Sequence, residues 1–373
     1  MLKTMGWSVG FRTGIIGLPN VGKSTLFNAL THTASAQNEN YPFCTIEANL
    51  GEVPVNDSRL AEIAGFEKSK QIIQAKTTFV DIAGLVKGAS KGEGLGNKFL
   101  GNIREVDALA HVVRCFDDNN IVHVDGQVDP LRDIETIETE LMLADLESIE
   151  RQRSRLVRKI RGGDKESLKI DGLLELAQEK LEHGIHARPT GLDEEDTKLW
   201  HRLKLLTSKP FLYVCNVDEN SLSDGNNYSA QVEEYARKHD ASTVLVSAQI
   251  EEEISQLNAG EEQEYLTEMG LDRSGLDRLI QKGYSLLGLI TYFTTGPNET
   301  RAWTIQKGTN AADAAAVIHE DFRRGFIRAE TISFEEFISC GGYQLARQSG
   351  KIRTEGKTYK VKDGEILHFL FNV

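Results

Sequence analysis

The segment Gly-Leu-Pro-Asn-Val-Gly-Lys-Ser at residues 17–24 constrains the fold more than any other part of the chain. A glycine-rich turn of this pattern joins a strand to a helix, and its backbone N–H groups converge on phosphate oxygens. Lys23 can reach the β- and γ-phosphates, and the Ser24 hydroxyl can bind Mg²⁺. The flanking residues agree, because 13–16 form a strand-like apolar run and 25–30 have helical spacing. We therefore predict a nucleotide-binding strand, loop and helix.

The rest of the first half alternates short apolar runs with helical patterns. Runs of this kind are typical of a parallel sheet with helices on both faces, so we predict a doubly wound α/β fold. A long polar segment with helical spacing interrupts the pattern. Gly162 and Gly163 divide this segment in two. An antiparallel helical hairpin inserted into the α/β domain is the expected structure. The predicted strands are residues 14–16, 77–82, 108–116, 210–215 and 242–246.

From about residue 289 the pattern changes to short alternating strands around one alanine-rich helix. This pattern predicts a small mixed α+β domain at the C-terminal end. The expected organisation is a nucleotide-binding domain in two parts, residues 11–132 and 209–288, an inserted hairpin at 133–208 and the α+β domain at 289–373. Residues 1–10 receive no structural assignment from the sequence.

Composition excludes several classes of protein. The net charge is −13, the four cysteines are far apart, and no apolar run approaches the length of a membrane helix. We expect a cytoplasmic protein with no membrane partner, no DNA partner, no zinc site and no disulfides. A local basic patch remains possible.

Two further segments complete the expected metal site. Asp81 ends the apolar run 77–82 and precedes Gly84, as in strands that hold a Mg²⁺-bound water beside the γ-phosphate. Thr45 lies between the first helix and that strand, where a switch loop can place a hydroxyl on Mg²⁺. An exposed threonine without a function is the alternative for Thr45. The expected metal ligands are Ser24, Thr45 and Asp81.

The catalytic group is less clear from the residues. Leu85 stands where many GTPases carry the glutamine that orients the attacking water, and leucine cannot do so. His123 is a candidate because a neutral imidazole can position or deprotonate water, although a buried structural histidine is equally consistent. Asn20 can place a side-chain carbonyl on a monovalent cation beside the phosphates, so we also consider K⁺.

The base-reading segment departs from that of GTPases. GTPases use Asn-Lys-x-Asp, in which the aspartate accepts two hydrogen bonds from guanine. This chain has Asn216-Val217-Asp218-Glu219. Moving the carboxylate and opening an apolar slot favours adenine, so we predict a preference for ATP over GTP. A GTPase that uses Glu219 as a substitute acid and an ATP-gated adaptor that does not hydrolyse ATP remain alternatives.

These motifs together resemble the YchF or Obg-like ATPase family of P-loop proteins, in the Obg branch of translation-factor-related NTPases. The resemblance rests on residues 17–24, 40–45, 81–99 and 216–219, and on segments 301–304 and 363–366, which are similar to the β-grasp TGS domain. It implies Mg²⁺-dependent hydrolysis of ATP to ADP and phosphate, and association with ribosomes. It also implies phosphate contacts from Asn20, Val21, Gly22, Lys23, Ser24 and Thr25, adenine contacts from Asn216 and the Val217 backbone, and Lys23 and His123 as catalytic residues.

A cluster of positive charge lies near the expected tip of the hairpin. A run of this kind is often only a solvated helix face. On a protruding hairpin of an acidic protein, it is also a candidate contact for ribosomal RNA. The cluster consists of Arg151, Arg153, Arg155, Arg158, Lys159 and Arg161.

Overall fold

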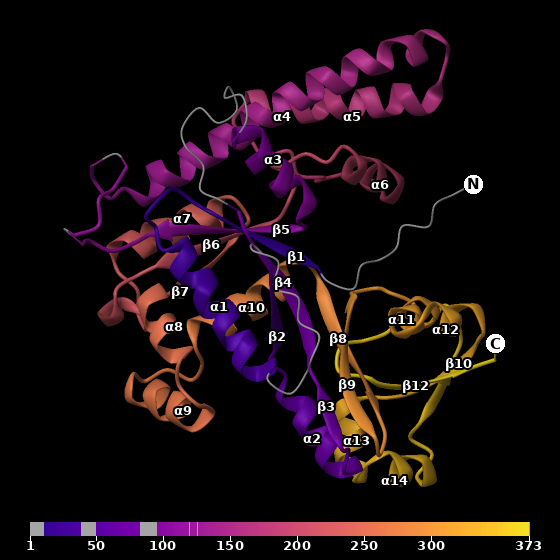
Figure 1. The fold of residues 1–373 in the computed structure, drawn as a ribbon. Helices are drawn as coiled ribbons and strands as arrows, with labels where there is room; N and C mark the ends of the chain where they lie inside the picture. Colours follow the sequence, from indigo (N-terminus) through magenta and orange to yellow (C-terminus); the bar gives the residue numbers. More distant parts are fainter. Residues whose placement is uncertain (1–10, 39–49, 83–94, 119, 125, 373) are drawn as a thin grey trace. The chain divides into compact units, whose positions relative to one another are not determined.

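The computed structural model describes residues 11–38, 50–82, 95–118, 120–124 and 126–372 (Figure 1). The chain forms two compact units. The larger unit contains residues 12–51 and 79–279, and the smaller one contains 52–78 and 280–373. Within the described residues, no helix is both long enough and apolar enough to cross a membrane.

A six-stranded sheet contains the parallel strands of the larger unit, and its strand order is β2-β4-β1-β5-β6-β7. Strand β1 pairs in parallel with β5, β5 with β6 and β6 with β7. Every residue of β5 and β6 is buried, as expected for central parallel strands covered on both faces. The strands are β1 (Arg12–Ile16), β2 (Leu50–Val55), β4 (Ala75–Asp81), β5 (Ala108–Arg114), β6 (Phe211–Asn216) and β7 (Ser242–Val246).

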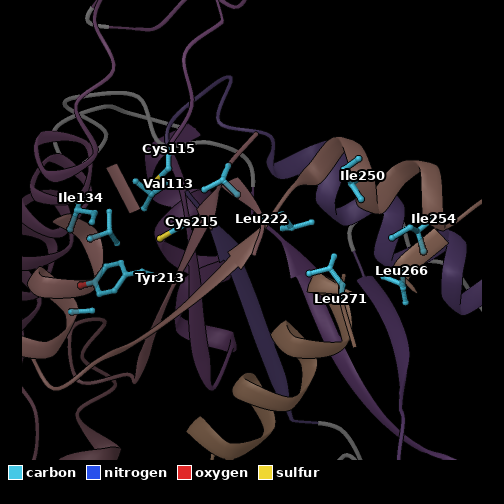
Figure 2. Packing of buried hydrophobic residues seen from close by; sticks show 13 residues of the cluster. Val113, Cys115, Ile134, Tyr213, Cys215, Leu222, Ile250, Ile254, Leu266 and Leu271 are labelled. Carbon is cyan, nitrogen blue, oxygen red and sulfur yellow. The ribbon is translucent and has the colours of Figure 1, made fainter. Parts of the chain in front are cut away.

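Helices alternate with these strands and complete the α/β fold that the sequence predicts. A hydrophobic cluster joins the carboxyl ends of β5 and β6 to the neighbouring helices, and Figure 2 shows Cys115, Cys215 and Tyr213 within it. The helices are α1 (Lys23–Asn38), α3 (Leu95–Glu105), α7 (Asn227–Lys238), α8 (Ala248–Ile254), α9 (Ala259–Glu268) and α10 (Gly275–Leu286), with the 3₁₀ turn η1 (Glu219–Ser221) after β6.

The inserted segment forms the predicted helical hairpin. Helix α4 (Pro130–Arg161) and helix α5 (Lys165–Glu182) run side by side in opposite directions, and α6 (Glu194–Arg202) follows (Figure 1). The turn between α4 and α5 contains Gly163 with φ 81°, which is a left-handed conformation. Helix α4 begins with Pro130, and the Asp129 carboxylate caps it by accepting the Arg132 N–H.

The smaller unit has the strand order of a β-grasp domain. Its sheet reads β11-β10-β12-β8-β9-β3, and the first and last strands of the C-terminal segment, β8 and β12, are parallel neighbours. Its core packs Tyr292, Trp303 and Phe369 against alanines of α11. The elements are β8 (Leu289–Thr295), β9 (Glu299–Gln306), α11 (Ala311–Ile318), α12 (Glu320–Arg324), β10 (Phe326–Ile332), α13 (Phe334–Cys340), α14 (Tyr343–Gln348), β11 (Arg353–Glu355) and β12 (Ile366–Phe371).

Residues 52–78 group differently from the expected domain boundaries. Strand β3 (Gln71–Ile73) extends the smaller sheet by pairing in parallel with β9. Helix α2 (Ser58–Glu67) joins the same unit, since the Arg59 guanidinium contacts the Asp363 carboxylate at 2.7 Å and lies over the Phe293 ring. These pairings join residues more than 200 positions apart, so the local pattern of the sequence does not reveal them.

Candidate functional site

The phosphate loop connects β1 to α1 and has a backbone that requires glycine at two positions. Gly17 has φ 153° and Gly22 has φ 95°. A Cβ atom on Gly17 would lie 2.5 Å from the Val112 carbonyl oxygen, and one on Gly22 would lie 2.4 Å from Asn216 Nδ2. Asn20 also has a positive φ, 63°, which asparagine tolerates better than most residues. The loop therefore packs closely against β5 and the end of β6.

Lys23, the first residue of α1, lies at the centre of this loop. Its side chain is 7 % exposed, and Nζ donates a hydrogen bond to the Leu18 carbonyl oxygen at 2.6 Å. Burial lowers the pKa of Lys23 to about 8, although the negative charge of Asp81 acts in the opposite direction. The lysine therefore lies where phosphate oxygens could replace a single carbonyl as its partner.

Asp81 and Ser24 form the part of the metal site that the structure describes. Burial raises the pKa of Asp81, and the Lys23 charge partly offsets this effect. Ser24 is exposed on the first turn of α1. A hydroxyl and a carboxylate beside a phosphate loop are hard oxygen donors, so these residues fit Mg²⁺. Among the described residues, no group of three acidic, histidine or cysteine side chains is placed to hold a metal ion, so the phosphates and water would supply other ligands. Thr45 and Leu85 lie outside the described residues.

Asn216 connects three parts of the site. Its Nδ2 donates to the Val21 carbonyl oxygen at 2.9 Å, and its Oδ1 accepts the Ala248 N–H at 2.9 Å. The side chain is almost completely buried. One amide therefore fixes the phosphate loop to the end of β6 and to the start of α8. The sequence identified Asn216 as a base contact but not this second role.

The three residues after Asn216 have different environments. Val217 is 2 % exposed, belongs to the hydrophobic cluster, and donates its N–H to the Val246 carbonyl oxygen. Asp218, which precedes η1, accepts hydrogen bonds from the hydroxyl of Ser221, the last residue of η1. Glu219 is exposed. The side chain that replaces the GTPase lysine is therefore part of the core, and the acid that replaces the aspartate faces solvent.

The loop from β5 to α4 passes beside the phosphate loop. Asn20 Nδ2 donates to the Val122 carbonyl oxygen at 3.1 Å. The next residue, His123, is 8 % exposed, and its Nε2 lies 2.9 Å from Asp133 Oδ2 on the first turn of α4. The structure thus brings the backbone at Val122 to the phosphate loop and turns the His123 imidazole towards α4. No sequence motif identified Asp133.

The arrangement is chemically suited to bind the phosphates of a nucleotide. A buried lysine, a helix N-terminus and a carboxylate at the end of the neighbouring strand surround the loop. Asn216 and the start of α8 lie on the side where the loop adjoins the end of β6. This is the end of the parallel strands at which open α/β sheets bind ligands.

Comparisons with known proteins agree with this geometry. A family model described as a 50S ribosome-binding GTPase matches residues 12–146, and the YchF-GTPase_C model, described as a protein of unknown function, matches residues 289–372. The chain is 51 % identical to "Ribosome-binding ATPase YchF" of Bacillus subtilis, over 96 % of this chain and 99 % of that protein. It is 52 % identical to the Haemophilus influenzae protein of the same name, over 98 % of this chain and 100 % of that protein.

A solved structure covers nearly the same length. The YchF GTPase of Schizosaccharomyces pombe superposes with a TM-score of 0.87 at 37 % identity, and the match covers 97 % of this chain and 98 % of that one. The doubly wound fold with a C-terminal domain, predicted from the sequence, is confirmed.

Proposed function

This chain belongs to the YchF family of P-loop nucleotide hydrolases, and from that premise we propose that it is a Mg²⁺-dependent ATPase that acts with the ribosome. It binds ATP in preference to GTP and hydrolyses it to ADP and phosphate. Curated relatives that match almost the whole chain carry the name ribosome-binding ATPase. The cytoplasm is the expected location.

The base-reading segment is the single observation that supports the preference for ATP. In Asn-Lys-x-Asp, the lysine packs along the pocket and the aspartate binds guanine. Here Val217 is buried in the core, and Glu219 is exposed on η1. Guanine would leave its N1–H and N2 amino donors without a carboxylate, at a cost of about 1–3 kcal/mol for each unpaired group. Adenine lacks both donors.

The adenine contacts follow from the groups that remain. The Val217 N–H is already bound to Val246, so its carbonyl oxygen is the backbone group that can accept the adenine amino group. Asn216 Nδ2 carries two hydrogens and uses one on Val21, so the other can face the ring. Residues 20–25 bind the phosphates, and Lys23 balances charge that develops during phosphoryl transfer.

Bound metal ions would add to the positive charge that Lys23 supplies at the γ-phosphate. Ser24, Thr45 and Asp81 would hold Mg²⁺, which would polarise the phosphoryl oxygens. The Asn20 amide N–H donates a hydrogen bond to the Val122 carbonyl oxygen, so the amide oxygen is the end available to K⁺. Faster turnover in K⁺ than in Na⁺ at equal ionic strength would support that cation site, and identical rates would remove it.

His123 is our candidate for the group that replaces the missing glutamine. It adjoins Val122, which contacts the phosphate loop, and Asp133 binds its Nε2. The imidazole faces α4 in this structure, so activation of water by His123 requires the contact with Asp133 to open. Ribosomes or another partner would then accelerate a slow intrinsic reaction.

Phosphate release measured with ATP and with GTP tests the activity. We expect release from ATP above background, its loss in Lys23→Ala, and its loss in His123→Ala even at concentrations at which a fluorescent ATP analogue still binds that variant. Binding without phosphate release would instead identify an ATP-gated adaptor. Faster release from GTP would identify a GTPase.

The hairpin tip is our candidate for a contact with ribosomal RNA. Arg153 is engaged within the hairpin, where its Nε lies 2.9 Å from Asp171 Oδ1. The other five basic residues of the cluster are exposed, and no ion pair holds them among the described residues. They are Arg151, Arg155, Arg158, Lys159 and Arg161.

Ribosome co-sedimentation tests this contact. The double variant Arg155→Glu/Arg158→Glu should pellet less and with a weaker dependence on salt, because it has lost phosphate contacts. The matched control is Lys198→Glu/Lys238→Glu, which changes the same charge on α6 and α7. Equal pelleting of the two double variants would reject the RNA contact at the tip.

A further inference from the structure

Arg114, the last residue of β5, is a buried cation that binds carbonyl oxygens instead of a carboxylate. Its side chain is 2 % exposed, and it forms no ion pair with any residue that the structure describes. Its Nε, Nη2 and Nη1 donate to the carbonyl oxygens of Phe116, Asp118 and Ile121 at 3.1, 3.1 and 3.0 Å. The guanidinium also lies over the Phe116 ring, 4.8 Å from its centroid. One guanidinium therefore binds three backbone carbonyls in the first part of the loop that leads to α4.

The loop reaches the phosphate loop immediately after the last of these contacts. The carbonyl oxygen of Val122, the next residue after Ile121, accepts the hydrogen bond from Asn20 Nδ2. The Val122 side chain is 75 % exposed, so packing does not hold this residue in place. Its backbone position is set by Arg114 on one side and by the contact between His123 and Asp133 on the other.

The contact with Val122 determines which end of the Asn20 amide is free. The nitrogen donates to the carbonyl oxygen of Val122, so the amide oxygen is the end of the side chain that this contact does not use. Asn20 is exposed and has φ 63°, a conformation that needs support from neighbouring groups. Arg114 thus acts on the phosphate loop through the Val122 carbonyl and the Asn20 side-chain amide.

We propose that Arg114 is a positioning residue for nucleotide binding, which holds the carbonyls of Phe116, Asp118 and Ile121 so that the Val122 carbonyl fixes Asn20 and the phosphate loop. The inference deepens the proposed function, because it assumes that this loop binds ATP. Lysine at position 114 would keep the charge but lose the planar set of donors that three separate carbonyls need.

A double-mutant cycle on the affinity for a fluorescent ATP analogue tests the proposal with the full chain in Mg²⁺. We expect Arg114→Lys and Asn20→Ala each to weaken binding about five- to tenfold. Because the arginine acts through Asn20, the double variant should bind no more weakly than the weaker single variant. Arg202→Lys, on exposed α6, is the matched control and should bind like the wild type.

Each other outcome is decisive. The positioning role would be overturned, with ATP binding intact, by either of two results. One is a loss of affinity in the double variant equal to the product of the two single losses, and the other is unchanged affinity in Arg114→Lys. A wild-type chain that does not bind the analogue would instead overturn the proposed function. Circular dichroism and thermal unfolding identify the folded variants. If Arg114→Lys does not fold, the same cycle is made with Arg114→Gln, which keeps side-chain donors at this position but cannot bind all three carbonyls.

Discussion

At the residue scale, Asn216 and Val217 show why a base-reading motif has more than one role. The asparagine amide joins the phosphate loop to α8, whereas the valine belongs to the core. The first role requires asparagine whichever base is bound, because both ends of the amide are engaged. Only the positions after it are free to change specificity.

Glu219 gives the first prediction. Glu219→Asp shortens the exposed acid by one methylene and restores the last residue of the GTPase motif. Affinity for GTP relative to ATP should rise about tenfold or more, since one regained hydrogen-bonded group is worth about 1–3 kcal/mol. Competition titrations measure the ratio, with Glu252→Asp on the exposed side of α8 as the control. An unchanged ratio would show that this position does not face the base.

Glu251 gives a prediction about pH. It is 1 % exposed, its Oε1 accepts the Gly275 N–H at 2.6 Å, and its Oε2 has no hydrogen-bond partner among the described residues. Burial raises the pKa of Glu251 from its ordinary 4.5 to about 7. The folded chain therefore binds more protons than the unfolded chain between these values. Stability falls as the pH rises through this window, and the loss is complete above about pH 7.

Glu251→Gln removes this titration. The free energy of unfolding of the variant relative to that of the wild type should be about 2–3 kcal/mol higher at pH 8 than at pH 5. The difference between their melting temperatures should rise accordingly. Thermal unfolding across this range measures it, and Glu252→Gln should show no such trend. A constant difference between variant and wild type would contradict the assignment.

At the element scale, the base of the hairpin depends on one buried carboxylate. Glu138 on α4 accepts hydrogen bonds from the hydroxyls of Tyr213 on β6 and Tyr235 on α7, and it lies 3.1 Å from His186 Nε2 after α5. Burial alone would raise the pKa of Glu138, but these partners lower it to about 2. Glu138 is thus charged at neutral pH and joins both arms of the hairpin to the sheet.

Glu138→Ala should destabilise the larger unit by about 3 kcal/mol, since it leaves buried donors without an acceptor. Thermal unfolding measures the loss, and limited proteolysis should cut the hairpin faster. The exposed neighbour Glu135 supplies the control variant, Glu135→Ala. Equal stability of the two variants would mean that packing alone holds α4.

At the scale of the whole molecule, features that depend on local sequence patterns could be predicted, and features that depend on pairing between distant segments could not. The phosphate loop, the parallel strands, the hairpin and a C-terminal α+β unit follow from glycine spacing and hydrophobic period, which act over a few residues, whereas the β-grasp assignment came from the family resemblance. The addition of β3 and α2 to the smaller unit does not, because it depends on pairing with residues near 300 and 363. The contact of Arg114 with three carbonyls is likewise set by the path of a loop.

Arg59 tests the assembly of the smaller unit. It joins Asp57 and Asp363, and its side chain is 27 % exposed. Arg59→Ala should lower stability by about 1–2 kcal/mol, because charged hydrogen bonds at a partly exposed site are only partly screened. Thermal unfolding measures this, with Arg237→Ala on exposed α7 as the control. No difference from the control would indicate that residues 52–78 add little to that unit.

The preference for adenine is the central claim, and competition for a bound fluorescent ATP analogue tests it most directly. Unlabelled ATP and GTP are titrated separately against the full chain in Mg²⁺. The account predicts that ATP displaces the analogue at a concentration at least about tenfold lower than GTP does. Displacement by GTP at an equal or lower concentration would contradict it.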